Sequence, residues 1–165
     1  MRVLIMIAAL ATSVLTPLAS AQQSVLHIGT LHAVPGQPPI ERATVLVVDG
    51  TIDRVERGYR SPDDLGVPGA TTIDLTDHHA TPGLIDCHTH ITGQSVPVFE
   101  RMRRAMQETE AYSAIDGVVY AERTLMAGFT TVRNVGSGGS TGYALRDRID
   151  RGMIPGPRMF ISGPA

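Results

Sequence analysis

A short apolar segment that ends in two histidines constrains the fold of this chain more than any other feature. Its sequence is Pro82-Gly83-Leu84-Ile85-Asp86-Cys87-His88-Thr89-His90. A Pro-Gly turn followed by an apolar run is typical of a short buried strand, which we expect over residues 84–91. Successive side chains of a strand point to opposite faces, so His88 and His90 should share one face and Cys87 should lie on the other.

The sequence after His90 alternates between helical and strand periods. Helices are expected at 98–109, 111–127 and 143–151, and strands at 130–135 and 159–162. The order strand, helix, strand, helix, strand is typical of a parallel sheet with right-handed crossovers. The sequence therefore predicts an α/β fold, as the start of a (β/α)8 TIM barrel with about three of its strands present. A doubly wound open sheet would also place ligands at the C-terminal ends of its strands.

Residues 22–81 indicate a separate small β layer. Short strands rich in branched residues are expected at 25–28, 44–48, 51–55 and 71–75. Asp49-Gly50 is a strong two-residue hairpin signal between the second and the third of these strands. A lone sheet of this size needs a partner face to bury, so we expect it to pack on another part of the protein.

Residues 1–21 have the pattern of a secretory signal peptide. Arg2 gives a positive start, an apolar run covers residues 3–15, and Ala19-Ser20-Ala21 forms a cleavage site of small residues. The run is shorter than the ~20 residues that span a bilayer, so we expect export to the periplasm or the extracellular space, without stable membrane insertion after cleavage. Cys87 is the only cysteine, which excludes an internal disulfide, and we expect it to be a small packed residue.

The composition is that of an ordinary soluble protein and indicates no nucleic-acid partner. Hydrophobic residues make up 42% of the chain, and the formal net charge is −2. The densest basic group, Arg101, Arg103 and Arg104, is interrupted by apolar residues and is typical of the solvated face of a helix. All 14 basic residues are arginine, and the chain has no lysine.

His88 and His90 are the candidate metal ligands. Two imidazoles on one face at the C-terminal end of a strand can share one small cation, and imidazole is a common ligand of Zn²⁺. Asp86 lies two residues upstream on the same face and could orient a ligand from behind. An arginine at the end of an apolar strand usually pairs with another group, so Arg133 either forms a structural ion pair or clamps a substrate carboxylate.

The other polar motifs are interpreted as surface features. His78 and His79 fall in a polar turn and should be solvated, and His27 and His32 fit surface positions of the β layer. The glycine-rich turn at 136–139 lacks the Lys-Ser/Thr of a phosphate-binding loop. We expect it to be a flexible loop between a strand and a helix.

The segment at 82–90 resembles the first metal motif of the amidohydrolase superfamily. Residues 44–52 and 73–75 resemble the small β-sandwich that precedes the barrel of these enzymes. Residues 127–136 and 156–164 are similar to the branch of imidazolonepropionase-like and Xaa-Pro dipeptidase-like enzymes. The resemblance covers nearly all of the chain after the expected signal peptide.

The resemblance implies that residues 22–81 are the N-terminal part of the small β-sandwich domain and that residues 82–165 are the first βα units of an incomplete barrel. It also implies a divalent-metal hydrolase, with Zn²⁺ as the expected metal and one or two ions in the complete enzyme. Such an enzyme breaks a C–N bond of an amide, a cyclic amide or a dipeptide with metal-activated water. His88 and His90 carry over as ligands of one metal, and the expected partner is a small-molecule or dipeptide substrate.

The other ligands of that pattern do not carry over. They are a carboxylated lysine or a glutamate, two later histidines and an aspartate, but this chain has no lysine and no histidine after His90. Asn134 also stands where an aspartate is frequent. We therefore expect the N-terminal portion of an exported amidohydrolase, without a catalytic residue of its own and inactive alone. A deaminase or deacetylase of the same superfamily and a non-catalytic exported α/β binding module are the alternatives.

Overall fold

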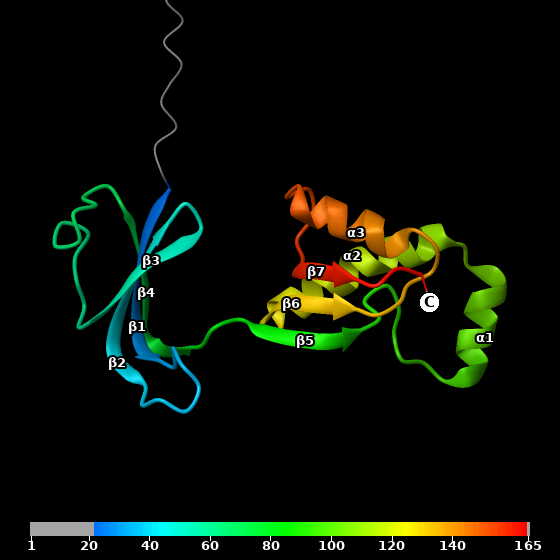
Figure 1. Ribbon diagram of the computed structural model, residues 1–165, viewed down its shortest axis with the longest axis horizontal. Helices are drawn as coiled ribbons and strands as arrows, with labels where there is room; N and C mark the ends of the chain where they lie inside the picture. Colours follow the sequence, from blue (N-terminus) through cyan, green and yellow to red (C-terminus); the bar gives the residue numbers. More distant parts are fainter. Residues whose placement is uncertain (1–21, 165) are drawn as a thin grey trace, which may run out of the picture. The chain divides into compact units, whose positions relative to one another are not determined.

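The computed structural model describes residues 22–164, which form two units that divide between Thr81 and Pro82 (Figure 1). The expected signal peptide at 1–21 lies outside the described residues. Within the described part, no helix combines the length and the apolar character that a membrane crossing requires. Each unit has buried clusters of its own and is described by itself.

The first unit is one four-stranded mixed sheet. Its strands are β1 (Gln23–Leu31), β2 (Ile40–Val48), β3 (Thr51–Arg57) and β4 (Thr71–Ala80). Their order in the sheet is β3-β2-β1-β4. β1 is antiparallel to β2 and parallel to β4, and β2 is antiparallel to β3. All four expected strands are present, and each extends beyond its expected bounds because pairing with neighbours continues past the apolar residues.

The apolar run of β2 is buried on both faces of the sheet. Residues 43–46 are all buried, with Leu46 in one cluster and Val45 in another. Asp49 and Gly50 join β2 to β3, and both have positive φ, at 49° and 75°. This is the backbone of the tight hairpin turn that an Asp-Gly pair favours, so the expected hairpin is confirmed.

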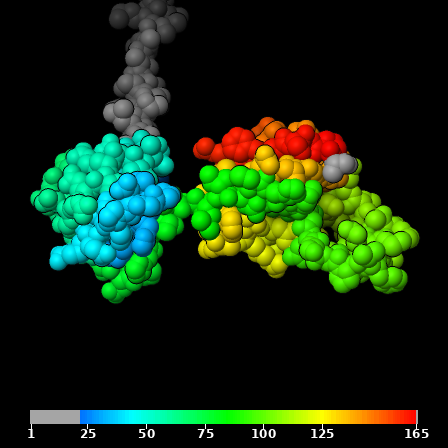
Figure 2. All heavy atoms as spheres, turned by 60° about the horizontal axis from the view of Figure 1, so that its bottom comes forward, coloured from blue at the N-terminus to red at the C-terminus, as the bar shows by residue number. Residues whose placement is uncertain are grey.

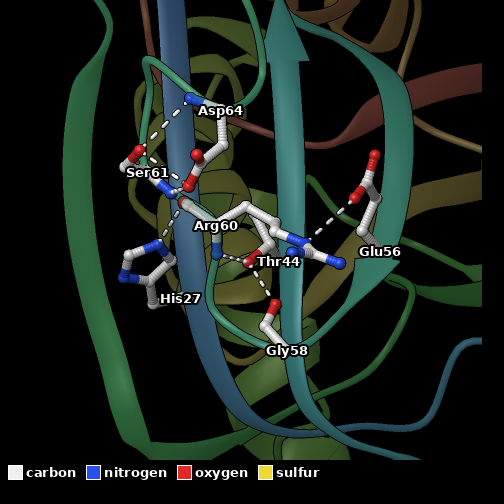
Figure 3. A network of polar contacts seen from close by, with 7 residues as sticks. All are labelled: His27, Thr44, Glu56, Gly58, Arg60, Ser61 and Asp64. Atoms are coloured by element: carbon white, nitrogen blue, oxygen red, sulfur yellow. Dashed lines mark hydrogen bonds and ion pairs between the residues drawn. The ribbon is translucent and has the colours of Figure 1, made fainter.

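The loop that follows β3 is fixed to the sheet by polar contacts at its start (Figure 3). Thr44 Oγ1 donates to the Gly58 carbonyl at 2.8 Å and accepts from the Arg60 N–H at 2.9 Å. The Arg60 carbonyl lies 2.8 Å from His27 Nε2, which donates to it. These bonds hold the loop so that its later residues Leu65 and Val67 close one face of the sheet.

The prediction of a polar turn at His78 and His79 is wrong, because both residues belong to β4, but both side chains are exposed as expected. β4 continues past this point as the parallel partner of β1, and the His32 N–H donates to the Ala80 carbonyl at 2.9 Å. Their pairing contains a bulge. The register shifts from Ile28 with Leu75 to Thr30 with His79. The bulge keeps the polar segment in the strand, and a partner strand rather than the local sequence imposes it.

Gly29 makes the bulge possible. A Cβ at this position would lie 2.2 Å from the Thr76 carbonyl oxygen, so only glycine lets the two backbones approach. The bulged segment is also held locally, because the Thr76 N–H donates to Asp74 Oδ1 at 3.0 Å. This backbone hydrogen bond holds the pKa of the Asp74 carboxyl below its ordinary value.

The second unit contains three strands and three helices. The strands are β5 (Leu84–Thr89), β6 (Phe129–Asn134) and β7 (Arg158–Ile161). The helices are α1 (Val98–Gln107), α2 (Glu110–Met126) and α3 (Thr141–Asp150). The strands form a parallel sheet in the order β5-β6-β7. The core joins Ala121 of α2 and Leu145 of α3 to the sheet, with Val132 of β6 and Met159 of β7. This is the predicted α/β arrangement of the start of a barrel.

β5 is an edge strand. The sequence predicted a buried strand here, but β5 is mostly exposed. Leu84 and Ile85 are 49% and 65% exposed, and Cys87 is also exposed. Within residues 22–164, β5 pairs only with β6, and Figure 2 shows its green segment uncovered at the surface of the second unit. The expectation of a packed Cys87 is wrong for the same reason. A strand with one neighbouring strand has fewer side chains packed around its own, so they stay exposed to solvent.

α1 is an exposed helix with its arginines in solvent, as the sequence predicted. None of its residues is buried. Glu100 binds Arg103 at 2.7 Å and Arg104 at 2.9 Å, and these hydrogen bonds lower the pKa of its carboxyl to about 2. The helix is therefore held by pairs along its own surface rather than by a buried stripe.

Gly29→Ala should destabilise the first unit, because the added methyl group meets the backbone of the bulge and not a flexible side chain. We expect a loss of about 1–3 kcal/mol in the free energy of unfolding, measured by urea denaturation of the full chain. Gly69→Ala is the matched control, since a Cβ there would meet open space. Equal stability of the two variants would contradict the assigned role of Gly29.

Candidate metal centre

The C-terminal ends of the three parallel strands lie at one edge of the second unit's sheet (Figure 1). His88 lies near the end of β5 and His90 follows that strand directly, while Asn134 ends β6. Ligand-binding groups of parallel α/β folds collect at this edge, because the loops that follow the strands meet there. The fold therefore brings both predicted ligands to the expected position.

The two imidazoles lie close enough to share one ion. The ring centroids of His88 and His90 are 5.7 Å apart, with the ring planes at 69°, and both side chains are exposed. Imidazole nitrogens bind Zn²⁺ at ~2.0–2.1 Å, which places the centroids of two rings on one tetrahedral ion about 5 Å apart. The separation of the two rings is therefore close to the separation expected for two ligands of a single divalent ion.

His90 is held in the tautomer that a metal requires. Its Nδ1 lies 3.0 Å from the Gly136 carbonyl oxygen. A carbonyl oxygen only accepts, so Nδ1 donates its proton and the lone pair of the neutral ring is on Nε2. Metal-binding histidines commonly donate their second ring N–H to a backbone carbonyl in this way. Nε2 is therefore the atom of His90 that is available to an ion.

Asn134 ties the backbone beside this ligand to the loop after β6. Its side chain is fully buried, and its Oδ1 accepts from the Ile91 N–H at 2.8 Å. Its Nδ2 donates at 3.4 Å to the same Gly136 carbonyl that holds the His90 ring. Sequence reasoning missed both Asn134 and Gly136 as positioning residues. An amide at the end of an apolar strand was the available signal.

A bulge in β5 sets the backbone conformation at His88, the other predicted ligand. The register pairs Asp86 with Val132 and then Thr89 with Asn134. Side chains hold both polar groups of the peptide unit between Cys87 and His88. Asp86 Oδ1 accepts from the His88 N–H at 2.9 Å, and Arg133 Nε donates to the Cys87 carbonyl at 2.7 Å. This one peptide unit is thus fixed from two sides.

These contacts sharpen what the sequence indicated for Asp86 and Arg133. Asp86 was expected to orient a ligand, and its hydrogen bond is with the main-chain N–H of His88 rather than with an imidazole. Arg133 forms no ion pair within the described part of the chain, so the structural alternative takes the form of a bond to a carbonyl. Its role toward a substrate carboxylate stays a prediction.

The histidine pair would supply only part of the ligand shell of a metal ion. Among residues 22–164, no three His, Cys, Asp or Glu side chains lie together as a cage for an ion. An open hollow of about 400 Å³ borders Asp86, Thr89 and His90 and extends along α2 to Arg123. The His90 side of the pair is therefore open to solvent and to small molecules.

Asp86→Ala and Arg133→Met should not act independently, because both side chains hold the same peptide unit. Each exposed bond should contribute about 1 kcal/mol to the free energy of unfolding. The double variant should lose less than the sum by about 0.5 kcal/mol or more, measured as a double-mutant cycle in urea. Arg123→Met is the control, since Arg123 has no ion pair or side-chain hydrogen bond in the described part. Strict additivity would contradict the shared role.

Comparison with known proteins identifies the family to which the second unit is similar. The profile described as "Amidohydrolase family" matches residues 79–165. An imidazolonepropionase of Mesorhizobium japonicum is 33% identical over 96 residues, which are 57% of this chain and 23% of that protein. A 5-methylthioadenosine/S-adenosylhomocysteine deaminase of Pyrococcus furiosus is 40% identical over 53 residues, which are 32% of this chain and 11% of that protein.

Solved structures agree with the sequence relatives. The crystal structure of a Xaa-Pro dipeptidase with bound methionine has a TM-score of 0.72 and 30% identity, and covers 87% of this chain and 34% of that chain. The chain thus spans about a quarter of the first sequence relative and about a third of this structure. Both enzyme types named in the resemblance are represented. The match at 79–165 includes the histidine pair and the loop that orients it, and the chain belongs to the amidohydrolase family.

Proposed function

We propose that this chain is the N-terminal portion of an exported, metal-dependent hydrolase of C–N bonds, with His88 and His90 as ligands of one divalent ion. The observation that carries the proposal is the hydrogen bond from His90 Nδ1 to the Gly136 carbonyl, because it leaves the lone pair of the neutral ring on Nε2, where a metal could bind. Family membership and the position of the pair at the C-terminal edge of the strands support the same role.

The donor set fits a borderline ion such as Zn²⁺, since two neutral imidazoles are favoured ligands of that class. When bound, such an ion lowers the pKa of its water and polarises the carbonyl of a substrate. The described residues supply the framework: Gly136 fixes one ring, and Asp86 and Arg133 fix the backbone of the other ligand. The remaining ligands and the residue that carries the proton are not assigned within 22–164.

The substrate class follows from the names of the relatives and belongs to the proposal. Imidazolonepropionases and a Xaa-Pro dipeptidase are among the proteins that the chain resembles, so a cyclic amide or a dipeptide is the proposed substrate. The deaminase match at 40% identity favours a second candidate, the hydrolytic removal of an amino group. Assays of the two product types, a carboxylate or ammonia, would separate these candidates. For the location, export is supported by the pattern of residues 1–21.

His88→Ala and His90→Ala should each weaken Zn²⁺ binding at this pair by more than the ~10-fold that follows loss of an outer partner of a ligand. Ring resonances of both histidines in NMR spectra, recorded during a ZnCl₂ titration, measure this directly. His27→Ala is the control, because that ring is engaged by the Arg60 carbonyl. Unchanged Zn²⁺ shifts at the remaining histidine of either variant would overturn the assignment.

Residues 22–165 loaded with Zn²⁺ should not hydrolyse Xaa-Pro dipeptides or an imidazolone, because two imidazoles alone leave the ion's shell without a protein carboxylate. The measurement is product formation by liquid chromatography, compared with the His88→Ala/His90→Ala variant. Turnover that the double variant abolishes would contradict the expected inactivity of this portion while supporting the metal assignment.

A further inference from the structure

Two histidines of the first unit form another imidazole pair. The rings of His32 and His79 are nearly parallel, with planes 21° apart and centroids 5.7 Å apart. His32 Nε2 and His79 Nδ1 are 3.4 Å apart, and both side chains are exposed. We propose that this pair binds one divalent transition-metal ion, of the class of Zn²⁺, Ni²⁺ or Cu²⁺, on the small β unit.

The bulge in β4 creates the pair. Ile28 lies opposite Leu75, and an unbroken register would place Asp77 opposite Thr30. The bulge instead places His79 opposite Thr30, and His32 lies two residues beyond Thr30, directly after β1. Bulges often redirect a side chain toward a functional position. The bulge that the close backbone approach at Gly29 allows therefore places the imidazole of His79 near His32, where an unbroken register would place the carboxylate of Asp77.

The distance between the two nitrogens matches a shared ion. Two nitrogens at ~2.0–2.1 Å from one tetrahedral ion are about 3.3–3.4 Å apart. The observed 3.4 Å is longer than the ~2.9–3.0 Å of a typical N–H hydrogen bond, so a shared proton holds this pair weakly. Both side chains are exposed, so their rings can turn toward a shared ion.

The same face of the sheet carries a carboxylate. Thr30 lies opposite Glu41 of β2, and Thr30 Oγ1 donates to Glu41 Oε2 at 3.0 Å. Directly opposite residues project from one face, so Glu41 and His79 flank Thr30 in one row. Leu31 is buried, and His32 therefore projects with the row of Thr30, away from the core. The Glu41 charge favours a cation at the pair without acting as a ligand.

The donor type selects the ion. Imidazole nitrogens favour Zn²⁺, Ni²⁺ and Cu²⁺, whereas Mg²⁺ and Ca²⁺ require oxygen ligands. Within 22–164 no third ligating side chain joins the pair, so water completes the shell. Because His32 follows β1 and His79 lies in β4, the bound ion would connect these two parallel strands at the edge of the sheet.

The test uses the full chain carrying His88→Ala and His90→Ala, so that the other pair does not contribute. We expect ZnCl₂ to shift the ring resonances of His32 and His79 together, with one ion per chain by calorimetry, and MgCl₂ to shift neither. Adding His32→Ala or His79→Ala should lower Zn²⁺ affinity by more than ~10-fold. The outcome does not depend on the proposed hydrolase function.

His78→Ala is the matched control, because His78 precedes His79 in the same strand and forms no ring pair within the described residues. Zn²⁺ should raise the melting temperature of the background chain and of the His78→Ala variant, but not of the His79→Ala variant. His79→Gln replaces the alanine variant if that variant does not fold without metal. The proposal would be overturned by an equal loss of Zn²⁺ affinity in the His78 and His79 variants. It would also be overturned if ZnCl₂ left the ring resonances of His32 or of His79 unshifted.

Discussion

The geometry of the candidate metal centre depends on the peptide unit between Cys87 and His88. At an edge strand, one side of the backbone has no neighbouring strand within the described residues, so main-chain pairing alone leaves His88 loosely placed. The Asp86 carboxylate takes the N–H of this unit and the Arg133 guanidinium takes its carbonyl. Two charged side chains therefore replace part of the rigidity that a central strand would obtain from its partners.

The sequence predicts the elements better than it predicts their register. The Asp-Gly hairpin, the parallel strands and the crossover helices follow from local patterns of turn residues and apolar spacing. The bulges at Cys87 and at His78 do not, because each arises where a strand meets a partner that is distant in the sequence. The rings of His88 and His90 nevertheless lie 5.7 Å apart, although a bulge between Asp86 and Thr89 interrupts the alternation from which their proximity was predicted.

Burial was the other property that local patterns did not determine. Ile85 and Cys87 have the residue types of a core strand, yet both are exposed because β5 has one neighbour among residues 22–164. Asn134 shows the opposite case, since a polar side chain at the end of β6 is fully buried. Its burial is compensated by the bonds to Ile91 and Gly136, which only the folded loops bring within reach.

The Gly136 carbonyl controls which ring nitrogen of His90 carries the proton. It accepts two hydrogen bonds at once, one from the ring of His90 and one from the side-chain amide of Asn134. If this peptide turned away, the proton of the neutral imidazole would be free to move to Nε2, and the lone pair on Nε2 would be lost. The conformation of one glycine peptide in the loop after β6 thereby determines the tautomer of a histidine that follows a different strand.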